Sequence, residues 1–403
     1  MQAVQPSALQ GIRVLDLSRI LAGPSATQLL GDLGADVVKV EKPDEGDDTR
    51  KWGPPYIKDK AGVETEESAY YLCANRNKRS IAIDIATAEG QARIHELLGR
   101  ADVLVENYKV GGLAKYGLAY EQLKDRYPGL VYCSVTGFGQ TGPYAKRAGY
   151  DFLIQGMGGI MSLTGEPEGT PMKVGVGIAD VMTGMYAAVG ILAALRHRDA
   201  TGAGQHIDIS LLDSQIAWLV NAGTNYLAAG QLPTRLGNGH PNIVPYQVFD
   251  TADAPLILAV GNDAQFARFC EVAGLAGLSD DERYRTNVAR IAHRDELCGL
   301  VQQALRGRRR ADWLAALEAV GVPCGPVNNL EDVFGDPHVK ARGARVDLPC
   351  AWAQEGHVSL LANPLKLSET PVDYRRPPPR LNEHEQEILA DWLAPAAARA
   401  QHA

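Results

Sequence analysis

The chain has 403 residues, of which 45% are hydrophobic and 22% are charged. This length allows two domains, each with its own core, and the composition is that of an ordinary globular protein. The net charge of −8 argues against a nucleic-acid partner and against a membrane partner with an anionic surface.

Targeting and metal-binding signals are lacking. The first ten residues have neither the basic region nor the apolar core of a secretory signal, and no apolar run reaches the length of a membrane span. The six cysteines show no CxxC spacing, so we expect reduced thiols and a cytoplasmic protein. The nine histidines form no HExxH or comparable pattern, and we expect no metal site.

The first 139 residues alternate short β-branched runs with helical patterns. Between the first two runs, Pro24 and Ser25 begin a helix that Gly34 ends. Such strand–helix–strand units build parallel sheets, so the sequence predicts an α/β fold with a large, open, Rossmann-like parallel sheet. The predicted strands are residues 12–17, 35–41, 80–85, 101–108 and 130–139.

Two glycine patterns invite a dinucleotide-binding interpretation. GFGQTG at 137–142 follows a strand, but Pro143 and Gly149 make the required long helix doubtful. GVGIAD at 175–180 ends in a carboxylate, which would repel a pyrophosphate. We therefore expect no nicotinamide or flavin cofactor.

The later part of the chain has more helix and more charge. Residues 234–249 have the composition of a loop, and residues 256–263 predict a strand that helical patterns follow. We divide the chain into a large α/β domain, a linker helix, a smaller α+β domain and a segment that returns to the large domain. The predicted bounds are 1–205, 206–225, 226–330 and 331–403.

Asp180 lies between a glycine-rich approach and a long apolar helix. The helix, from Val181 to Leu195, is so apolar that we expect it to be buried on all sides. Asp180 can be interpreted as a helix cap, the commoner role of Asp at this place. It can also be a nucleophile that backbone N–H groups and the helix dipole keep ionised.

Nine segments, in order along nearly the whole chain, resemble the family III CoA transferases. They include GIRVLDLSRILAGPSATQLLGDLGADVVKVEKP, SVTGFGQTGP, KVGVGIADVMTG and RPPPRLNEHEQEIL. The resemblance implies that coenzyme A, as an acyl-CoA, and a carboxylic acid are the substrates. It also implies an interlocked homodimer and makes Asp180 the catalytic residue.

The resemblance also implies which residues contact CoA. Most follow predicted strands, and ligands in open α/β sheets bind at these carboxyl ends. Each lysine among them could equally be a solvated surface charge. The implied CoA contacts are Lys42, Ile83, Asp84, Ile85, Asn107, Tyr108, Lys109 and Lys115.

Further residues are implied for the acyl group and the oxyanion. Leu21 stands where formyl-CoA transferases carry a glutamine, and the loop LGNGHPN replaces their four-glycine lid, so formyl or oxalate specificity is doubtful. Arg19 could instead pair with the distal carboxylate of a dicarboxylic acyl group. This predicted group comprises Arg19, Leu21, Tyr150, Gly175, Gly177, Gly237, Gly239 and His240.

Two enzyme functions fit this resemblance. NGHPNIVPYQVF and GVPCGPVNN look most like succinyl-CoA:glutarate transferases, which favours CoA transfer between dicarboxylic acids through an aspartyl anhydride and an aspartyl-CoA thioester. The alternative is a racemase resembling α-methylacyl-CoA racemase. That reaction needs a histidine before Asp151, where this chain has Tyr150, a poor base because its ordinary pKa is near 10.

Overall fold

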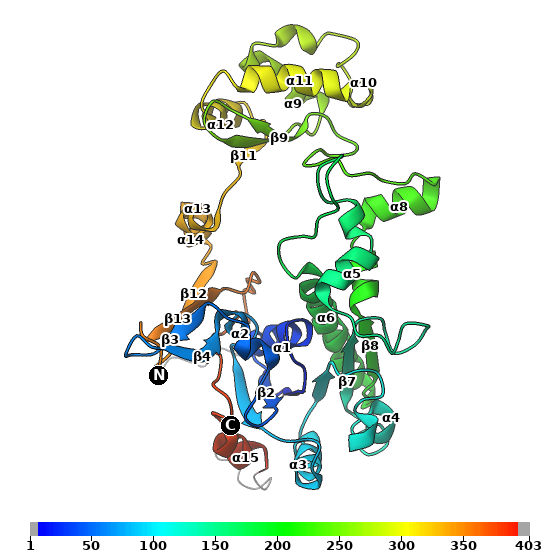
Figure 1. Cartoon of the computed structure of the whole chain (residues 1–403), viewed down its shortest axis with the longest axis vertical. Helices are drawn as coiled ribbons and strands as arrows, with labels where there is room; N and C mark the ends of the chain where they lie inside the picture. Colours follow the sequence, from blue (N-terminus) through cyan, green and yellow to red (C-terminus); the bar gives the residue numbers. More distant parts are fainter. Residues whose placement is uncertain (1–6, 394–403) are drawn as a thin grey trace. The chain divides into compact units, whose positions relative to one another are not determined.

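The computed structural model describes residues 7–393, so the first six residues, on which the signal-peptide expectation partly rests, lie outside it. The chain forms two compact units. The first contains residues 1–160, 173–229 and 340–403, and the second contains 161–172 and 230–339 (Figure 1). The sequence interpretation assigned residues 161–172 to the first domain, whereas the structure places them in the second unit. No composition or spacing in this short segment indicates the unit to which it belongs.

A six-stranded parallel sheet organises the first unit. Its strand order is β5-β2-β1-β6-β7-β8, which confirms the predicted α/β fold with a large parallel sheet. The strands are β1 (Arg13–Asp16), β2 (Asp36–Glu41), β5 (Lys78–Ala82), β6 (Val103–Glu106), β7 (Val131–Thr136) and β8 (His206–Ser210).

The stretch at 206–225, assigned as a linker helix in the domain division, begins with a strand. Residues 206–210 form β8, which pairs with β7 at the edge of the sheet. The linker continues as two helices, α7 (Leu211–Ala217) and α8 (Val220–Ala229), rather than one.

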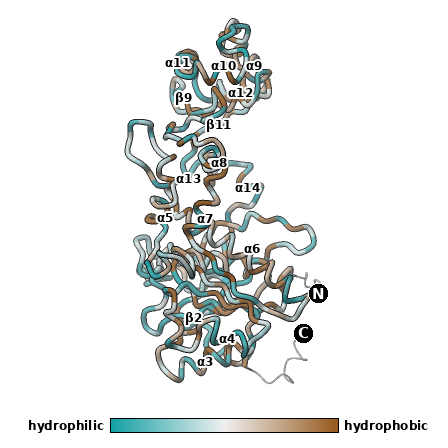
Figure 2. The backbone as a smooth tube through the Cα atoms, turned by 90° about the vertical axis from the view of Figure 1, so that its right-hand side faces the viewer, coloured by the Kyte–Doolittle hydropathy of each residue, from teal (hydrophilic) through white to brown (hydrophobic). Residues whose placement is uncertain are grey.

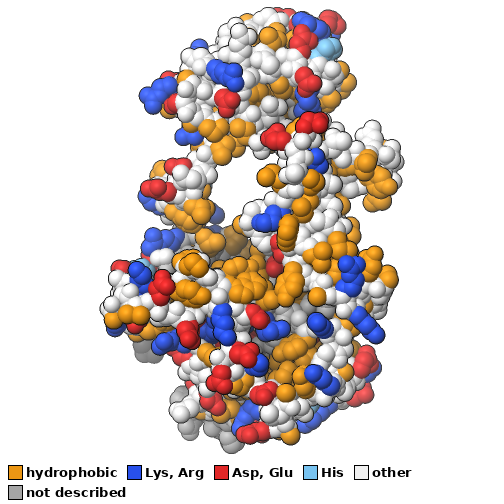
Figure 3. Space-filling view, in the orientation of Figure 1, with side chains coloured by type: hydrophobic (Ala, Val, Ile, Leu, Met, Phe, Trp, Pro, Cys, Tyr) orange, Lys and Arg blue, Asp and Glu red, His pale blue; other side chains and the backbone are white. Residues whose placement is uncertain are grey.

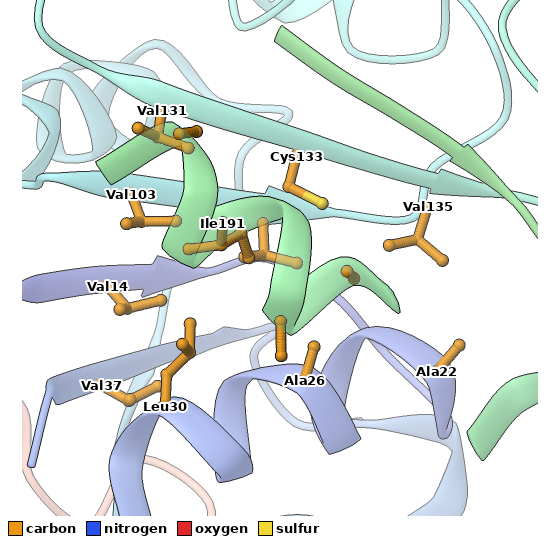
Figure 4. Close-up of a cluster of buried hydrophobic side chains, with 14 of the residues drawn as sticks. Val14, Ala22, Ala26, Leu30, Val37, Val103, Val131, Cys133, Val135 and Ile191 are labelled. Atoms are coloured by element: carbon orange, nitrogen blue, oxygen red, sulfur yellow. The ribbon is translucent and has the colours of Figure 1, made fainter. Parts of the chain in front are cut away.

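Helices cover both faces of the sheet. On one face, α1 (Ala22–Asp32) and α6 (Ile178–Thr201) pack against each other and over β1, β6 and β7 (Figure 4). A Cβ atom at Gly184 of α6 would lie 2.7 Å from the Ala22 carbonyl oxygen, so these two helices require glycine at their contact. The other face is covered by α3 (Ala88–Leu98), α4 (Tyr120–Leu123) and α15 (Glu385–Trp392).

The prediction that the apolar helix is buried on all sides is wrong. One side of α6 packs in the core, but Met185 is 48% exposed and Val189 is 63% exposed. By length and composition α6 could cross a membrane, with a mean hydropathy of 1.8 over 18 residues, which corrects the expectation that no run is long enough (Figure 2). Core helices of soluble proteins pass the same test, and α6 packs on α1 and the sheet.

Smaller elements complete the first unit. Two antiparallel hairpins, β3–β4 and β12–β13, carry a separate apolar cluster with α2. These elements are β3 (Tyr56–Lys58), β4 (Glu64–Ser68), α2 (Ala69–Leu72), α5 (Asp151–Met157), β12 (Arg345–Pro349) and β13 (His357–Leu361), with 3-10 turns η1 (Asp48–Lys51) and η2 (Ala114–Tyr116). Two elements span a boundary between the units along the chain, η3 (Ile160–Ser162) and α14 (Pro337–Ala341).

The second unit joins a small antiparallel sheet to helices. The sheet has the order β11-β10-β9, and β9 corrects the prediction that all of 234–249 is loop. Tyr246 to Asp250 pair with β10, so tertiary pairing overrides the loop-like composition before them. The elements are β9 (Tyr246–Asp250), β10 (Pro255–Ala259), α9 (Asp263–Ala273), η4 (Ala276–Leu278), α10 (Asn287–Ala292), α11 (Arg294–Leu305), α12 (Arg310–Ala319), β11 (Cys324–Pro326) and α13 (Leu330–Gly335).

Candidate active site

A cavity of about 390 Å³ opens beside the carboxyl ends of β1, β6 and β7, where ligands of open α/β sheets bind. The loops that follow these strands line it, together with residues 145–150 and the first turn of α6. The predicted site residues that line this cavity are Arg19, Leu21, Asn107, Tyr108, Lys109, Lys115, Tyr150 and Asp180.

Asp180 is the third residue of α6, whose N-cap is Gly177. It therefore does not cap the helix, as the simpler interpretation required. Its side chain is partly exposed in the cavity, and within residues 7–393 its carboxylate accepts no hydrogen bond. The oxygens of Asp180 are thus available to another molecule.

Asp151, which the sequence analysis did not assign to the site, takes the capping role. Its Oδ1 accepts the backbone N–H of Ala179 at 2.8 Å and that of Asp180 at 3.4 Å. Its Oδ2 accepts the amide of Gln155 at 2.8 Å. A cap supplied from a different helix leaves no pattern in the local sequence, which explains the omission.

The pKa of Asp180 is raised from 3.8 to about 7. Burial beside the cavity disfavours the charged form, and the negative charge of Asp151 adds to the effect. The sequence interpretation, in which N–H groups keep Asp180 ionised, is wrong in direction because those groups bond to Asp151. A carboxylate with this pKa gains and loses its proton near neutral pH, which is typical of reactive groups in active sites.

Basic side chains give the cavity a positive rim. Lys109, Lys115 and Arg147 all line it, and within the described part of the chain none of them forms an ion pair. The guanidinium of Arg147, a residue missed from the sequence, lies over the rings of Phe138 and Tyr144 at 5.2 and 4.5 Å. Unpaired cations around a cavity suit the phosphates of a nucleotide.

The loop after β1 holds two of the predicted substrate residues. The Asn107 side chain accepts the N–H of Arg19 and donates to its carbonyl, at 2.9 and 2.7 Å. The Arg19 guanidinium pairs with Asp48 at 2.8 Å, so a dicarboxylic substrate would compete with that partner. Leu21 abuts the start of α6, because a Cβ atom at Gly177 would lie 3.2 Å from its Cδ2.

Two close-packed glycines shape the wall that carries Tyr150. A Cβ atom at Gly149 would lie 2.6 Å from the Cα of Gly137, so neither position tolerates a side chain. Gly137 begins the GFGQTG pattern, which forms a loop, and the next helix, α5, has only seven residues, so the long helix doubted in the sequence analysis does not follow. Tyr150 is 60% exposed and precedes α5.

Several predicted CoA contacts do not line the cavity. Lys42 is exposed and pairs with Glu45 at 2.7 Å. Ile83 and Ile85 are buried in the core, because β5 ends at Ala82 and the chain then turns. Asp84, between them, is exposed and accepts the N–H of Ala86, so this stretch offers a ligand mainly its backbone and one carboxylate.

The predicted glycines fall into two groups. Gly175 and Gly177 precede α6, and a Cβ atom at Gly175 would meet nothing within 4 Å. Gly237, Gly239 and His240 belong to the second unit. There Gly237 has a φ of 57° and donates its N–H to Gly165, and the His240 ring lies 5.2 Å from that of Tyr246. Their expected role as a lid over Asp180 stays a prediction.

Comparison with known proteins identifies the family. The model of CoA-transferase family III matches residues 9–385. The chain belongs to this family. It is 53% identical to a succinate–glutarate CoA-transferase of Agrobacterium fabrum, over 95% of both chains. It is 42% identical to a human succinyl-CoA:glutarate CoA-transferase, over 96% of this chain and 86% of the human one.

Solved structures agree with this assignment. A CaiB/BaiF family protein from Brucella suis has a TM-score of 0.86 and 49% identity, and the match covers 96% of this chain and 100% of that one. As a CoA-transferase, the protein uses CoA as part of a substrate. Within residues 7–393, no group of three or more His, Cys, Asp or Glu side chains could hold a metal ion.

Proposed function

We propose that this CoA-transferase moves CoA from succinyl-CoA to a dicarboxylic acid such as glutarate, with Asp180 as the covalent nucleophile. The observation that carries the proposal is the unbonded Asp180 carboxylate, with a pKa of about 7, in a cavity with a positive rim. The substrates follow from the names of relatives that are 53% and 42% identical.

The exchange proceeds in four steps that balance. An Asp180 oxygen attacks the thioester carbonyl, and CoA leaves as the thiolate, which gives a mixed anhydride. The thiolate attacks the Asp180 carbonyl, releases the first acid and forms an aspartyl-CoA thioester. The incoming carboxylate attacks the carbonyl of that thioester, CoA leaves again as the thiolate, and a second anhydride forms. The thiolate then attacks the acyl carbonyl of this anhydride, which releases the new acyl-CoA and free Asp180.

The surroundings of Asp180 suit these steps. Asp151 holds the first turn of α6 in place and raises the pKa of Asp180, so that the attacking oxygen is a stronger nucleophile once ionised. Space is open beside Gly175, and backbone N–H groups near Gly175 and Gly177 are our candidates to hold the oxyanion. Lys109, Lys115 and Arg147 are placed to hold the CoA phosphates.

Racemisation is the second candidate and is not favoured. It would need a base opposite Asp180, and the residue before Asp151 is the exposed Tyr150 rather than a histidine. The relatives reported above are named as CoA-transferases.

An isotope experiment tests the function. Wild-type protein is incubated with succinyl-CoA and [14C]glutarate, and labelled glutaryl-CoA is measured. Mass spectrometry of protein incubated with succinyl-CoA alone should find a CoA adduct on Asp180. Asp180→Asn should lose both the product and the adduct, whereas a matched variant, Asp250→Asn in the second unit, should keep them. Transfer by Asp180→Asn at the wild-type rate would refute the nucleophile.

We also propose that the protein works as a homodimer. Hydrophobic side chains gather on one face of the first unit (Figure 3), and α8 has no buried residue, with Val220 at 67%, Tyr226 at 54% and Leu227 at 84% exposure. Contiguous apolar surface of this kind marks an interface. Light scattering should give twice the mass of 43.3 kDa, and Leu227→Asp should lower it.

A cytoplasmic location remains our proposal. All six cysteines are free thiols in the structure, which is the state that a reducing compartment maintains. Fractionation of cells that express the full chain, with detection by antibody, tests the location. Recovery in the membrane or secreted fraction would contradict it.

A further inference from the structure

The turn that leads from β1 into the cavity contains a strained residue. Ile20 has a φ of 72°, in the left-handed region that β-branched residues avoid. Arg19, Ile20 and Leu21 all line the cavity with Asp180. Because the unstrained conformation would move these side chains, other parts of the fold must hold the turn.

A buried ion pair bonds the chain at Ile20 and at Ser18, two residues before it. The Asp47 carboxylate is 1% exposed and accepts the Ile20 N–H with its two oxygens, at 3.2 and 3.3 Å. Lys39, which is fully buried, donates to Asp47 Oδ2 at 2.8 Å and to the Ser18 carbonyl at 2.9 Å. The ion pair therefore fixes the main chain at Ser18 and at the N–H of the strained Ile20.

Other contacts fix the ion pair itself. Asp47 Oδ1 accepts the backbone N–H and the hydroxyl of Thr49 at 3.0 and 2.7 Å, and the Asp47 N–H donates to Glu41 at 2.9 Å. Burial alone would raise the pKa of Asp47, but Lys39 and these hydrogen bonds lower it to about 2. Burial likewise opposes the charge of Lys39, and Asp47 and Asp16 outweigh it to raise its pKa. Both groups stay charged at neutral pH.

We propose that Asp47 and Lys39 are positioning residues for CoA transfer, which hold the Ile20 turn in the shape that lines the cavity beside Asp180. The effect reaches the nucleophile because Leu21 abuts Gly177, the N-cap of the helix that carries Asp180. Neither Asp47 nor Lys39 lines the cavity. The inference rests on the proposed function, since the rate of CoA transfer is one of its measurements.

A rescue experiment separates positioning from general stabilisation. Asp47→Asn weakens the hold on the turn, and we expect kcat/KM for CoA transfer to fall by about tenfold or more, measured per folded protein. Glycine adopts a φ of 72° without strain, so adding Ile20→Gly should recover most of that loss. A residue that only stabilised the fold would not be rescued by a second change at position 20.

The matched control is Asp32→Asn. Asp32 is also fully buried and paired, with Arg76, but neither residue lines the cavity. This variant should lower thermal stability and leave kcat/KM unchanged. An equal loss of kcat/KM in Asp32→Asn, a kcat/KM within about threefold of wild type in Asp47→Asn, or a failure of Ile20→Gly to rescue would overturn the inference.

A second variant of the ion pair and a second measurement extend the test. If Asp47→Asn does not fold, Lys39→Met with Asp47→Leu replaces the pair by apolar groups, a change that folds often tolerate. Hydrogen exchange of the amides of residues 18–22 should be faster than in wild type in Asp47→Asn and in the double variant, and unchanged in Asp32→Asn. This measurement needs no activity, so a wild type that transfers no CoA would refute the proposed function and leave the positioning inference testable. Unchanged exchange would refute the positioning inference.

Discussion

The raised pKa of Asp180 predicts how activity depends on pH. The nucleophile must be ionised, and its pKa is about 7 instead of 3.8. The ionised fraction is then about one tenth at pH 6 and about nine tenths at pH 8. We expect kcat/KM for succinyl-CoA to rise with pH in that proportion and to level off above pH 8. A profile that is flat from pH 5.5 to 8.5 would refute this account of Asp180.

The same pKa makes a prediction about stability. An acid whose pKa is raised by folding costs no stability below its ordinary pKa of 3.8, and the full cost applies above about 7. The rise in the pKa of Asp180 from 3.8 to about 7 sets an upper bound of about 4 kcal/mol on this loss of stability, at about 1.4 kcal/mol per pH unit. Because Asp180 is partly exposed to solvent in the cavity, we expect about 1–2 kcal/mol.

Asp180→Asn tests that value, because it removes the charge at nearly constant volume. Urea unfolding at pH 8 should show the variant to be more stable than wild type by about 1–2 kcal/mol, and the difference should shrink towards zero near pH 4. Asp151→Asn supplies the matched variant. It keeps an oxygen that can cap α6 but removes the like charge, so the midpoint of the activity profile should move to lower pH. A midpoint that stays in place or rises would contradict the role given to Asp151.

Three further predictions concern packing and charge. Gly184→Val should lower the free energy of unfolding by about 3 kcal/mol in thermal denaturation, because its Cβ would lie 2.7 Å from the Ala22 carbonyl; an unchanged melting temperature would refute the close contact. Arg147→Ala should raise KM for acyl-CoA about tenfold with little change in kcat. The difference in KM between variant and wild type should become smaller at high salt, and an effect on kcat alone would contradict phosphate binding. Gly149→Ala should impair CoA binding, measured by calorimetry, since no space remains beside Gly137.

Much of the large domain could be read from the sequence, because buried parallel strands are short β-branched runs separated by helical patterns. The runs that contain Val14 and Val103 became β1 and β6 as expected. The run at 80–85 was placed too late by about two residues, since the pairing of β5 with β2 ends at Ala82 and the chain then turns. The strand β8 lies at the start of the stretch assigned as a linker helix, and only its pairing with β7 places it at the edge of the sheet.

The sequence by itself determined the fold class, the family resemblance and the choice of Asp180, since each depends on residue types in a fixed local order. Only the tertiary structure brought Arg147 to the cavity and Asp151 to the first turn of α6, because contacts between separate segments leave no local pattern. It also reversed the expected electrostatics of Asp180. Which carboxylate receives the free N–H groups of a helix, and which one is left desolvated beside a like charge, depends on positions in space that no local sequence pattern records.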